Sequence, residues 1–314
     1  MRNRYYIHVI SAVFAAMLGA WSVANSAPYA AVVMDARTGK IYHSRNADTR
    51  LHPASLTKMM TLYVAFQAIE QNEISLNSYV TISRNATSEP PSKLGLKTGQ
   101  KIQLRYLIRA ASVKSANDAA TAIGEAISGS EAAFTKRMTR TARAMGMNKT
   151  TFKNAHGLTQ SGHLSTARDM TILGRHMIYD YPQYYNLFSR RSTDAKVRKV
   201  NNTNRRFLSA YKGADGIKTG YTRAAGFNLV ASAERGSERI IATMFGGTST
   251  AARNARVVKL LNMGFQRAPS TAKLQKPSLP IYDENQNEHQ GKTFDVMTAV
   301  KRSTRPKIRP FGSS

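Results

Sequence analysis

Apolar runs separated by turn signals lie near both ends of the chain, and apolar positions follow helical spacing in the middle. Two such runs flank the turn at residues 37–39, which predicts a β-hairpin. A second hairpin is predicted between Phe227 and Gly247, where the turn Arg-Gly-Ser-Glu separates two β-rich runs. The pattern favours one sheet built from both chain ends, with a helical block inserted between them.

The helical block is predicted from the spacing of apolar positions. Its first helix starts near Ser55, shortly after Pro53. The apolar positions of this helix are Leu56, Met59, Met60, Tyr63, Phe66 and Ile69. Further helices are predicted at residues 101–111, 118–127, 132–146, 166–178 and 251–265. Beyond about residue 270 the chain has prolines and polar runs without a core-forming period, so residues 271–314 are predicted to be a basic, disordered tail.

The first 26 residues have the layout of a secretory signal peptide. Two arginines precede a short apolar stretch, and Ala24 and Ser26 fit the small positions of a cleavage site. An uncleaved membrane anchor is the alternative, although the apolar run is short for a full span. We therefore expect a signal peptide at residues 1–26, a main domain at residues 27–270, and an exported protein of the periplasm or cell envelope.

Composition and charge narrow the chemistry further. The chain of 314 residues has no cysteine, which excludes a disulfide, a thiolate zinc site and a cysteine nucleophile. Its formal charge of +28 creates a field that attracts anions. Because an exported protein does not meet the genome, we expect membrane lipid or wall polymer as anionic partners, and no nucleic acid.

Ser55 and Lys58 form the first candidate catalytic pair. A serine at a helix start lies beside free backbone N–H groups, and a lysine three residues later lies on the same face. The amine can serve as a base for the hydroxyl only if burial or nearby cations lower its pKa. The Ser-x-x-Lys pattern alone is a weak signal, because serine is a common helix cap and lysine a common surface residue.

Two further elements carry polar side chains that could assist such a pair. Ser115 and Asn117 lie between two predicted helices, where they could relay a proton and hold a peptide carbonyl, although helix capping by Asn117 is the alternative. The tripeptide Lys-Thr-Gly occurs at residues 97–99 and at residues 218–220. The second copy has β-type neighbours, whereas the first is predicted to be a turn before a helix. We therefore assign chemistry to the second copy alone.

The three elements occur in the order that marks β-lactamases and penicillin-binding proteins: Ser-x-x-Lys, then Ser-x-Asn, then the second Lys-Thr-Gly. The segments ASLTKMMT, KSANDAA, TTFKNAHGL, STARDM, GIKTGYT and LLNMGF extend the likeness over roughly residues 28–267. The chain thus resembles the serine-type D-Ala-D-Ala carboxypeptidases, which are low-molecular-mass penicillin-binding proteins. The resemblance implies an α+β, three-layer α/β/α fold of the β-lactamase/transpeptidase type, with an antiparallel sheet.

The resemblance also implies catalytic roles for individual residues. Ser55 would be the acylated nucleophile, Lys58 its general base, and Ser115 the relay toward the leaving D-alanine. Asn117 would hold Lys58 and the substrate amide. Lys218 would complete a positive, proton-sharing cluster.

Substrate binding is implied for a second set of residues. Thr219 would bind the terminal carboxylate with help from Arg253, while Gly220 lets the substrate backbone come close. The backbone N–H groups of Ser55 and Tyr221 would form the oxyanion hole. The family often has histidine at the position of Tyr221. Because the backbone acts there, we expect little loss of activity, although substrate preference could change.

The implied function is a hydrolase that removes the terminal D-alanine from peptidoglycan stem pentapeptides through an acyl-enzyme, without cofactor or metal. β-Lactam antibiotics would be covalent inhibitors. The form SANDAA is typical of carboxypeptidases within the family. A D,D-endopeptidase that cleaves peptidoglycan cross-links is the alternative, and a non-catalytic, basic wall-binding protein on the same fold is an alternative of a different class.

Two other enzyme classes fit the sequence less well. A class A β-lactamase needs a glutamate between the second and third motifs, and no acid there has the Glu-x-x-Leu-Asn setting. A zinc peptidase needs two histidines and an acid, and His163 and Asp169 have no companion ligand at a suitable spacing. We therefore expect no metal at the site.

The C-terminal part departs from the family pattern. Many members carry a second β-domain and a C-terminal amphipathic helix that docks on the membrane. Residues 271–314 are too few for that domain and show no amphipathic stripe. The basic stretch KRSTRPKIRP is the candidate contact with anionic lipid or wall polymer.

Overall fold

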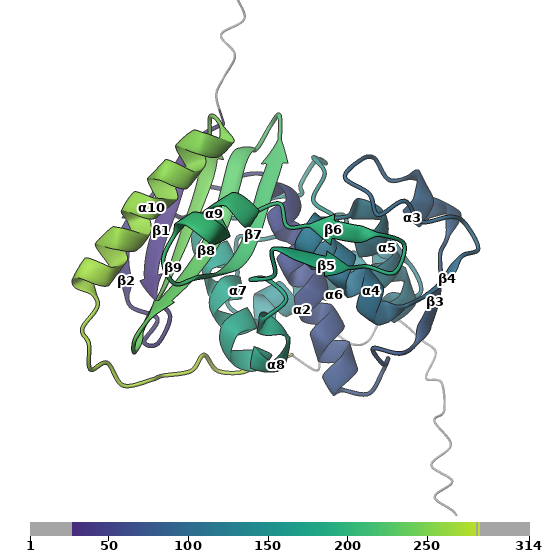
Figure 1. Cartoon of the computed structure of the whole chain (residues 1–314), viewed down its shortest axis with the longest axis horizontal. Helices are drawn as coiled ribbons and strands as arrows, with labels where there is room; N and C mark the ends of the chain where they lie inside the picture. Colours follow the sequence, from purple (N-terminus) through teal and green to yellow (C-terminus); the bar gives the residue numbers. More distant parts are fainter. Residues whose placement is uncertain (1–26, 281, 283–314) are drawn as a thin grey trace, which may run out of the picture. The chain divides into compact units, whose positions relative to one another are not determined.

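A five-stranded antiparallel sheet brings the two ends of the domain together (Figure 1). The strand order is β2-β1-β9-β8-β7, so the N-terminal hairpin pairs with the last strand of the C-terminal set. The strands are β1 (Ala30–Asp35), β2 (Ile41–Arg45), β7 (Ala214–Thr222), β8 (Gly226–Arg235) and β9 (Glu238–Gly247). The predicted hairpins and the single sheet from both chain ends are confirmed.

The computed structural model describes residues 27–280 and 282. The predicted signal peptide and residues 283–314 of the predicted tail, with the stretch KRSTRPKIRP, lie outside the described residues. Among the described residues, none of the helices combines the length and apolar character needed to cross a membrane.

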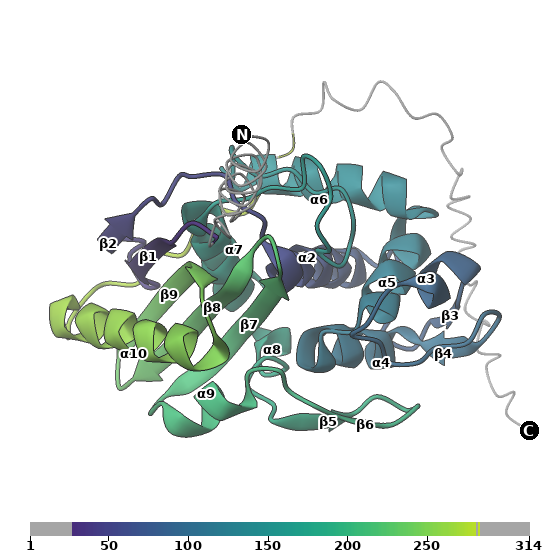
Figure 2. The same ribbon diagram turned by 90° about the horizontal axis from the view of Figure 1, so that it is seen from above.

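Both faces of the sheet are covered by helices, as Figure 2 shows. In β1, Ala31 and Val33 pack in one apolar cluster with Val257 of α10 (Thr250–Arg267). Val32 between them packs in the opposite cluster. Successive strand residues point to opposite faces, so a strand covered on both sides has a continuous apolar run. The three-layer α+β fold implied by the sequence is confirmed.

The helical block is organised around α2 (Thr57–Glu70), whose first twelve residues are all buried. A helix that is buried on every side has no face in contact with water, so its apolar residues are not confined to one stripe. The other helices of the block are α3 (Arg84–Ser88), α4 (Leu104–Arg109), α5 (Asn117–Ser128), α6 (Glu131–Ala144), α7 (Ala167–Asp180) and α8 (Pro182–Tyr185). Helix α7 packs against β1 and β9, so it joins the block to the sheet.

The helix predicted at residues 101–111 begins later than expected. Its first residues form β4 (Lys101–Gln103), which pairs with β3 (Tyr79–Thr81). Only Ile102 of that strand is buried, and this alternation suits a hairpin at the surface. The helical part follows as α4 and the π-helical turn η2 (Ala110–Lys114). A second small hairpin, β5 (Ser192–Asp194) with β6 (Lys199–Asn201), and helix α9 (Arg205–Ala210) were not predicted.

The segment after α10 has no helix or strand up to residue 280, yet it contacts the domain. The guanidinium of Arg37 donates to the Pro269 carbonyl over 2.8 Å, and the Gln275 backbone N–H donates to the Arg37 carbonyl, also over 2.8 Å. Near residue 282, the side chain of Gln67 donates to the Tyr282 hydroxyl over 2.5 Å. The predicted tail therefore starts along the domain surface rather than free of it.

Candidate active site

The sequence-predicted site residues meet in one cleft between the sheet edge and the helical block. A cavity of about 370 Å³ lies there. Its lining includes Ser55, Ser115, Asn117, Thr219, Gly220, Tyr221 and Arg253. Lys58 and Lys218 lie directly behind this lining and are almost completely buried. The three motifs, far apart in sequence, are thus brought together by the fold.

Ser55 lies in the short 3-10 turn η1 (Ala54–Leu56), directly before α2. Ala54 has a φ of 49°, a left-handed conformation that is costly for a residue with a Cβ. Gly157 lies under this turn: a Cβ there would come within 1.9 Å of the Ala54 carbonyl oxygen. The strained turn is therefore held in place by close packing from the loop around residue 157.

Lys58 has its amine surrounded by acceptors. Its Nζ lies 3.2 Å from Ser55 Oγ and donates over 2.7 Å each to Asn117 Oδ1 and the His156 carbonyl. Burial, and then the charge of Lys218, lower the pKa of Lys58 well below its ordinary value. A neutral amine at this distance can accept the Ser55 proton.

Ser115 and Lys218 form a second pair beside the first. Lys218 Nζ donates to Ser115 Oγ over 2.8 Å and to the Thr219 carbonyl over 3.2 Å. Burial, and then the charge of Arg253, lower the pKa of Lys218 to about 7. Ser115 has a φ of 65° at the end of η2, which turns its side chain out of the helix line toward β7.

Asn117 connects α5 to Lys58 of α2 and to the loop after α3. Its Oδ1 accepts from Lys58, and its Nδ2 donates to the Pro90 carbonyl over 2.7 Å. It is the first residue of α5, and the cap residue before it is Ala116, which provides no side-chain cap. The side chain of Asn117 thus bonds to Lys58 and to the Pro90 carbonyl and does not cap the helix.

The second Lys-Thr-Gly copy lies on β7, the edge strand of the sheet. Thr219 Oγ1 lies 2.8 Å from Thr203 Oγ1. A Cβ on Gly220 would come within 2.9 Å of the Pro53 carbonyl oxygen and 3.1 Å of the Ser55 nitrogen, so this strand passes directly against η1. Tyr221 follows with its ring exposed to solvent and against Phe227.

The first Lys-Thr-Gly copy lies elsewhere, on an exposed turn. Lys97 is exposed, and Thr98 Oγ1 lies 2.9 Å from Thr87 Oγ1. Gly99 has a φ of 78° and precedes β4 rather than a helix. None of the three residues lines the cleft around Ser55.

Arg253 enters the cleft from α10 and is buried. Its guanidinium donates to Asn254 Oδ1 over 3.1 and 2.8 Å. Burial lowers its pKa to about 10, so it remains charged at neutral pH. Within residues 27–280 and 282, no acidic side chain forms a salt bridge with it. A buried cation of this kind favours an anionic ligand.

A buried cluster behind Lys58 was not predicted. His156 Nε2 lies 3.1 Å from Glu89 Oε2 and 3.6 Å from Glu131 Oε1. His156 Nδ1 accepts from the Leu158 backbone N–H, so Nε2 carries the proton in this network. Burial raises the pKa of Glu89, but the hydrogen bonds from His156 and Thr121 and nearby positive charge outweigh it and lower the pKa overall.

These three side chains are close enough together to hold a metal ion, although the contact between His156 and Glu89 has the geometry of a direct hydrogen bond. His163 and Asp169 do not join them. His163 lies against Thr57 Oγ1, and Asp169 accepts from Thr150 Oγ1. No sequence signal pointed to the cluster, because Glu89 is distant in the chain from its partners.

A family model described as D-alanyl-D-alanine carboxypeptidase matches residues 20–249 of the chain. D-alanyl-D-alanine carboxypeptidase DacF of Bacillus subtilis is 37% identical over 261 residues, which cover 82% of this chain and 64% of DacF. The corresponding enzyme of Streptomyces sp. strain K15 is 31% identical, with 74% of this chain and 85% of that protein covered. The chain thus spans less than two thirds of DacF.

Solved structures of penicillin-binding proteins also superpose on this chain. Penicillin binding protein 5 from Haemophilus influenzae superposes with a TM-score of 0.73 at 37% identity, over 76% of this chain and 70% of that one. Penicillin-Binding Protein D2 from Listeria monocytogenes, in its ampicillin-bound form, superposes with a TM-score of 0.69 at 32% identity. That match covers 75% of this chain and 96% of that one.

Proposed function

The chain belongs to the D-alanyl-D-alanine carboxypeptidase family, and on that premise we propose that it removes the terminal D-alanine from peptidoglycan stem pentapeptides. The observation that carries the proposal is the contact between Lys58 Nζ and Ser55 Oγ at 3.2 Å, with the amine buried and its pKa lowered. A base of this kind turns a serine hydroxyl into a nucleophile at neutral pH.

Acylation follows from this contact. Ser55 Oγ attacks the carbonyl carbon of the penultimate D-alanine, and its proton passes to Lys58. The backbone N–H groups of Ser55 and Tyr221 stabilise the oxyanion, because β7 passes against η1 at Gly220. The C–N bond then breaks, and the proton held by Lys58 passes to the leaving amine through Ser115, which is hydrogen-bonded to Lys218, so that Lys58 is neutral again.

Deacylation uses the same base. Among the residues that the structure describes, those that line the cleft include no aspartate or glutamate. Lys58, neutral again and in contact with Ser55 Oγ, accepts a proton from the incoming water, and the ester to Ser55 is hydrolysed. This differs from a class A β-lactamase, in which a glutamate has that role.

The cations of the cleft bind the substrate carboxylate. Arg253 is buried and charged, and Lys218 lies behind Thr219 on the edge strand. A terminal carboxylate placed beside Thr219 would be the partner for both charges. The net charge of +28 adds a general attraction for anionic substrates.

The same proposal covers location and partners. We place the protein in the cell envelope, where peptidoglycan is found, and we expect β-lactams to acylate Ser55. An anionic wall polymer or lipid surface is the proposed partner of the basic surface.

Purified protein incubated with a stem pentapeptide tests the proposal. We expect release of one D-alanine per peptide, together with covalent labelling by a fluorescent penicillin. Ser55→Ala should lose both, while its melting temperature reports that it is folded.

Two other results would change the assignment. Cleavage of cross-linked peptide dimers without D-alanine release would identify an endopeptidase. A folded protein that neither cleaves nor labels, yet binds peptidoglycan, would identify a non-catalytic wall-binding protein.

A further inference from the structure

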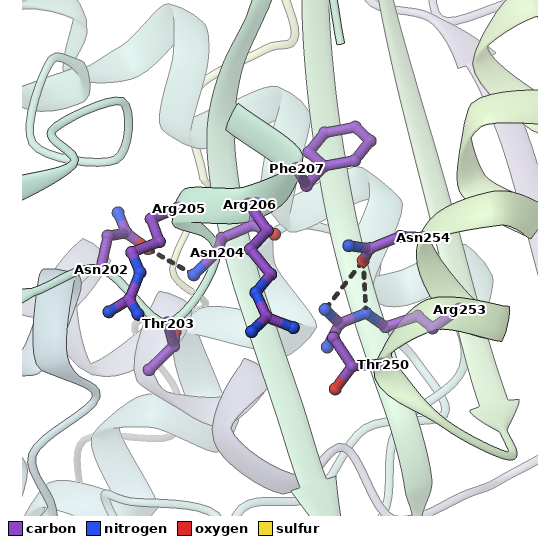
Figure 3. Close-up of a pocket in the computed structure, with 9 residues that line it drawn as sticks. All are labelled: Asn202, Thr203, Asn204, Arg205, Arg206, Phe207, Thr250, Arg253 and Asn254. Carbon is purple, nitrogen blue, oxygen red and sulfur yellow. Dashed lines mark hydrogen bonds between the residues drawn. The ribbon is translucent and has the colours of Figure 1, made fainter. Parts of the chain in front are cut away.

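A second cavity adjoins the catalytic cleft on the side of Arg253 (Figure 3). Its volume is about 250 Å³, and we call it the arginine pocket. It is lined by Asn202 to Phe207, at the start of α9, and by Thr250, Arg253 and Asn254 of α10. Thr203, Thr250 and Arg253 line both cavities, so a ligand in the cleft can extend into the arginine pocket.

The charge of the arginine pocket is positive without a balancing acid. Arg205, Arg206 and Arg253 contribute guanidinium groups, and none of the lining residues in the described part of the chain is acidic. Figure 3 shows the side chains of Arg206 and Arg253 extending into the same space. Among the described residues, neither Arg205 nor Arg206 forms a salt bridge. Such a concentration of like charge is relieved by an anion.

Asn204 gives an independent indication of a ligand. The residue is 2% exposed, and within residues 27–280 and 282 neither Oδ1 nor Nδ2 has a hydrogen-bond partner. It precedes α9 in the capping position but forms no side-chain cap. A buried amide without partners is costly, so a polar group that enters the pocket would remove that cost. Nδ2 is a donor that suits a carboxylate oxygen.

We infer that the arginine pocket binds a second acidic group on the leaving-group side of the substrate. The inference rests on the proposed function and refines its substrate class. A leaving residue that has only an α-carboxylate would occupy the cleft beside Thr219 and Arg253. A leaving residue with an additional carboxylate would place it in the arginine pocket, against Arg205, Arg206 and Asn204.

The chemical step is unchanged by this choice of substrate. Ser55 Oγ forms the ester with the penultimate D-alanine, the C–N bond to the acidic residue breaks, and the leaving amine takes the proton. Water then hydrolyses the ester. The arginine pocket acts on substrate binding and on the preference among leaving groups, since it does not touch the reacting atoms.

Three acetylated tripeptides test the inference: one ends in D-Ala-D-Ala, one in D-Ala-D-Glu and one in D-Ala-D-Gln. The last two match in size and differ by one negative charge. We expect kcat/KM for the glutamate peptide to exceed that for the glutamine peptide about fivefold. The double variant Arg205→Gln/Arg206→Gln should bring this ratio close to one.

Matched variants separate a local effect from loss of net charge. Lys136→Gln/Arg140→Gln removes two exposed charges from α6, neither of which lines either cavity, and should keep the wild-type ratio. Asn204→Asp keeps the side-chain shape and adds a negative charge, so it should lower the ratio below that of the wild type. Penicillin labelling of every variant reports that the fold and Ser55 are intact.

The same peptides are also used as competitors of fluorescent penicillin, which reads binding without hydrolysis. The inference would be overturned if the glutamate and glutamine peptides had equal kcat/KM values and competed equally with fluorescent penicillin. It would also be overturned if Arg205→Gln/Arg206→Gln kept the preference for the glutamate peptide. If no peptide is cleaved, the proposed function fails instead. The competition ratio then decides the inference on its own.

Discussion

Lys218 Nζ donates to Ser115 Oγ over 2.8 Å, although 103 residues separate them in the chain. The contact joins the edge strand β7 to the loop before α5, and so connects the sheet to the helical block. It also places a buried cation beside the pair formed by Ser55 and Lys58. Lys218 thereby has two effects, since it holds Ser115 and helps to lower the pKa of Lys58.

Lys218→Ala should slow acylation by penicillin at least about 100-fold, the scale at which a positioned proton-transfer group contributes. The variant removes the partner of Ser115 and one of the charges that lower the pKa of Lys58. Lys97→Ala is the matched control, because it changes the other Lys-Thr-Gly copy on an exposed turn. The rate of fluorescent penicillin labelling measures both. Similar rates for the two variants would contradict the assignment.

Stability should depend on pH through Lys218. Its pKa is about 7 in the folded protein, compared with an ordinary value of 10.5, so the unfolded chain binds the proton more tightly. The free energy of unfolding should therefore rise with pH between about 7 and 10.5, by on the order of a few kcal/mol.

Lys218→Met removes this titration while it keeps an unbranched side chain that is one atom shorter. Denaturant unfolding at several pH values, for both proteins, gives the difference between them. The difference should change across this pH range in the direction stated. A wild type and variant with parallel pH profiles would show that Lys218 does not titrate in this way.

Gly157→Ala should both destabilise the protein and slow acylation. The new Cβ would meet the Ala54 carbonyl at 1.9 Å and would displace the turn that carries Ser55. We expect a loss of about 3 kcal/mol or more in the free energy of unfolding, because a backbone clash is added to an unfavourable φ.

Gly146→Ala separates these two contributions. Gly146 has a φ of 80°, close to the 90° of Gly157, but a Cβ added to Gly146 would have no neighbour within 4 Å among the described residues. Gly146→Ala should lower the free energy of unfolding by only about 1 kcal/mol and should be acylated by penicillin at the wild-type rate. Thermal unfolding and penicillin labelling measure the two effects, and equal losses in both variants would rule out the packing explanation.

Glu89→Gln tests the cluster behind Lys58. The substitution weakens the pairing with His156, whose carbonyl accepts from Lys58 Nζ. We expect acylation to slow about tenfold and its pH profile to shift, which a purely structural role would not cause. Glu125→Gln is the control, since that carboxylate bonds only to Ser83 and Asn85 among the described residues. A normal pH profile in Glu89→Gln would exclude the positioning role.

The pKa of Glu89 is lowered in the folded protein, like that of Lys218, but for a different reason. Burial disfavours the charged form of Lys218, whereas hydrogen bonds and nearby positive charge favour the charged form of Glu89. The pKa of Glu89 is lowered in the folded state, so its contribution is present above its ordinary pKa of 4.5. It is lost as the pH falls through the lower folded value. The difference in the free energy of unfolding between Glu89→Gln and the wild type should therefore become smaller as the pH falls below 4.5.

Local features of the sequence were sufficient for several parts of the site. The pair Ser55 and Lys58 was predicted because residues three apart share a helix face, and that geometry needs no tertiary information. The hairpins were predicted because their turns and alternating strands are local. The order of three short motifs then distinguished Lys218 from Lys97. The helix expected at residues 101–111 begins later, because its first three residues pair with β3 in a short surface hairpin.

Other features depend on residues that meet only after packing. Glu89 lies on one segment and His156 on another, and nothing in either segment predicts that they pair beneath Lys58. The unpartnered amide of Asn204, and the cavity that it lines together with residues of α10, appear only in the folded chain. The sequence by itself determined which groups could react and which helix and strand carry them. The tertiary structure decided which of them are buried together, because burial and the field of distant charges set the pKa values and the ligand preference of the cleft.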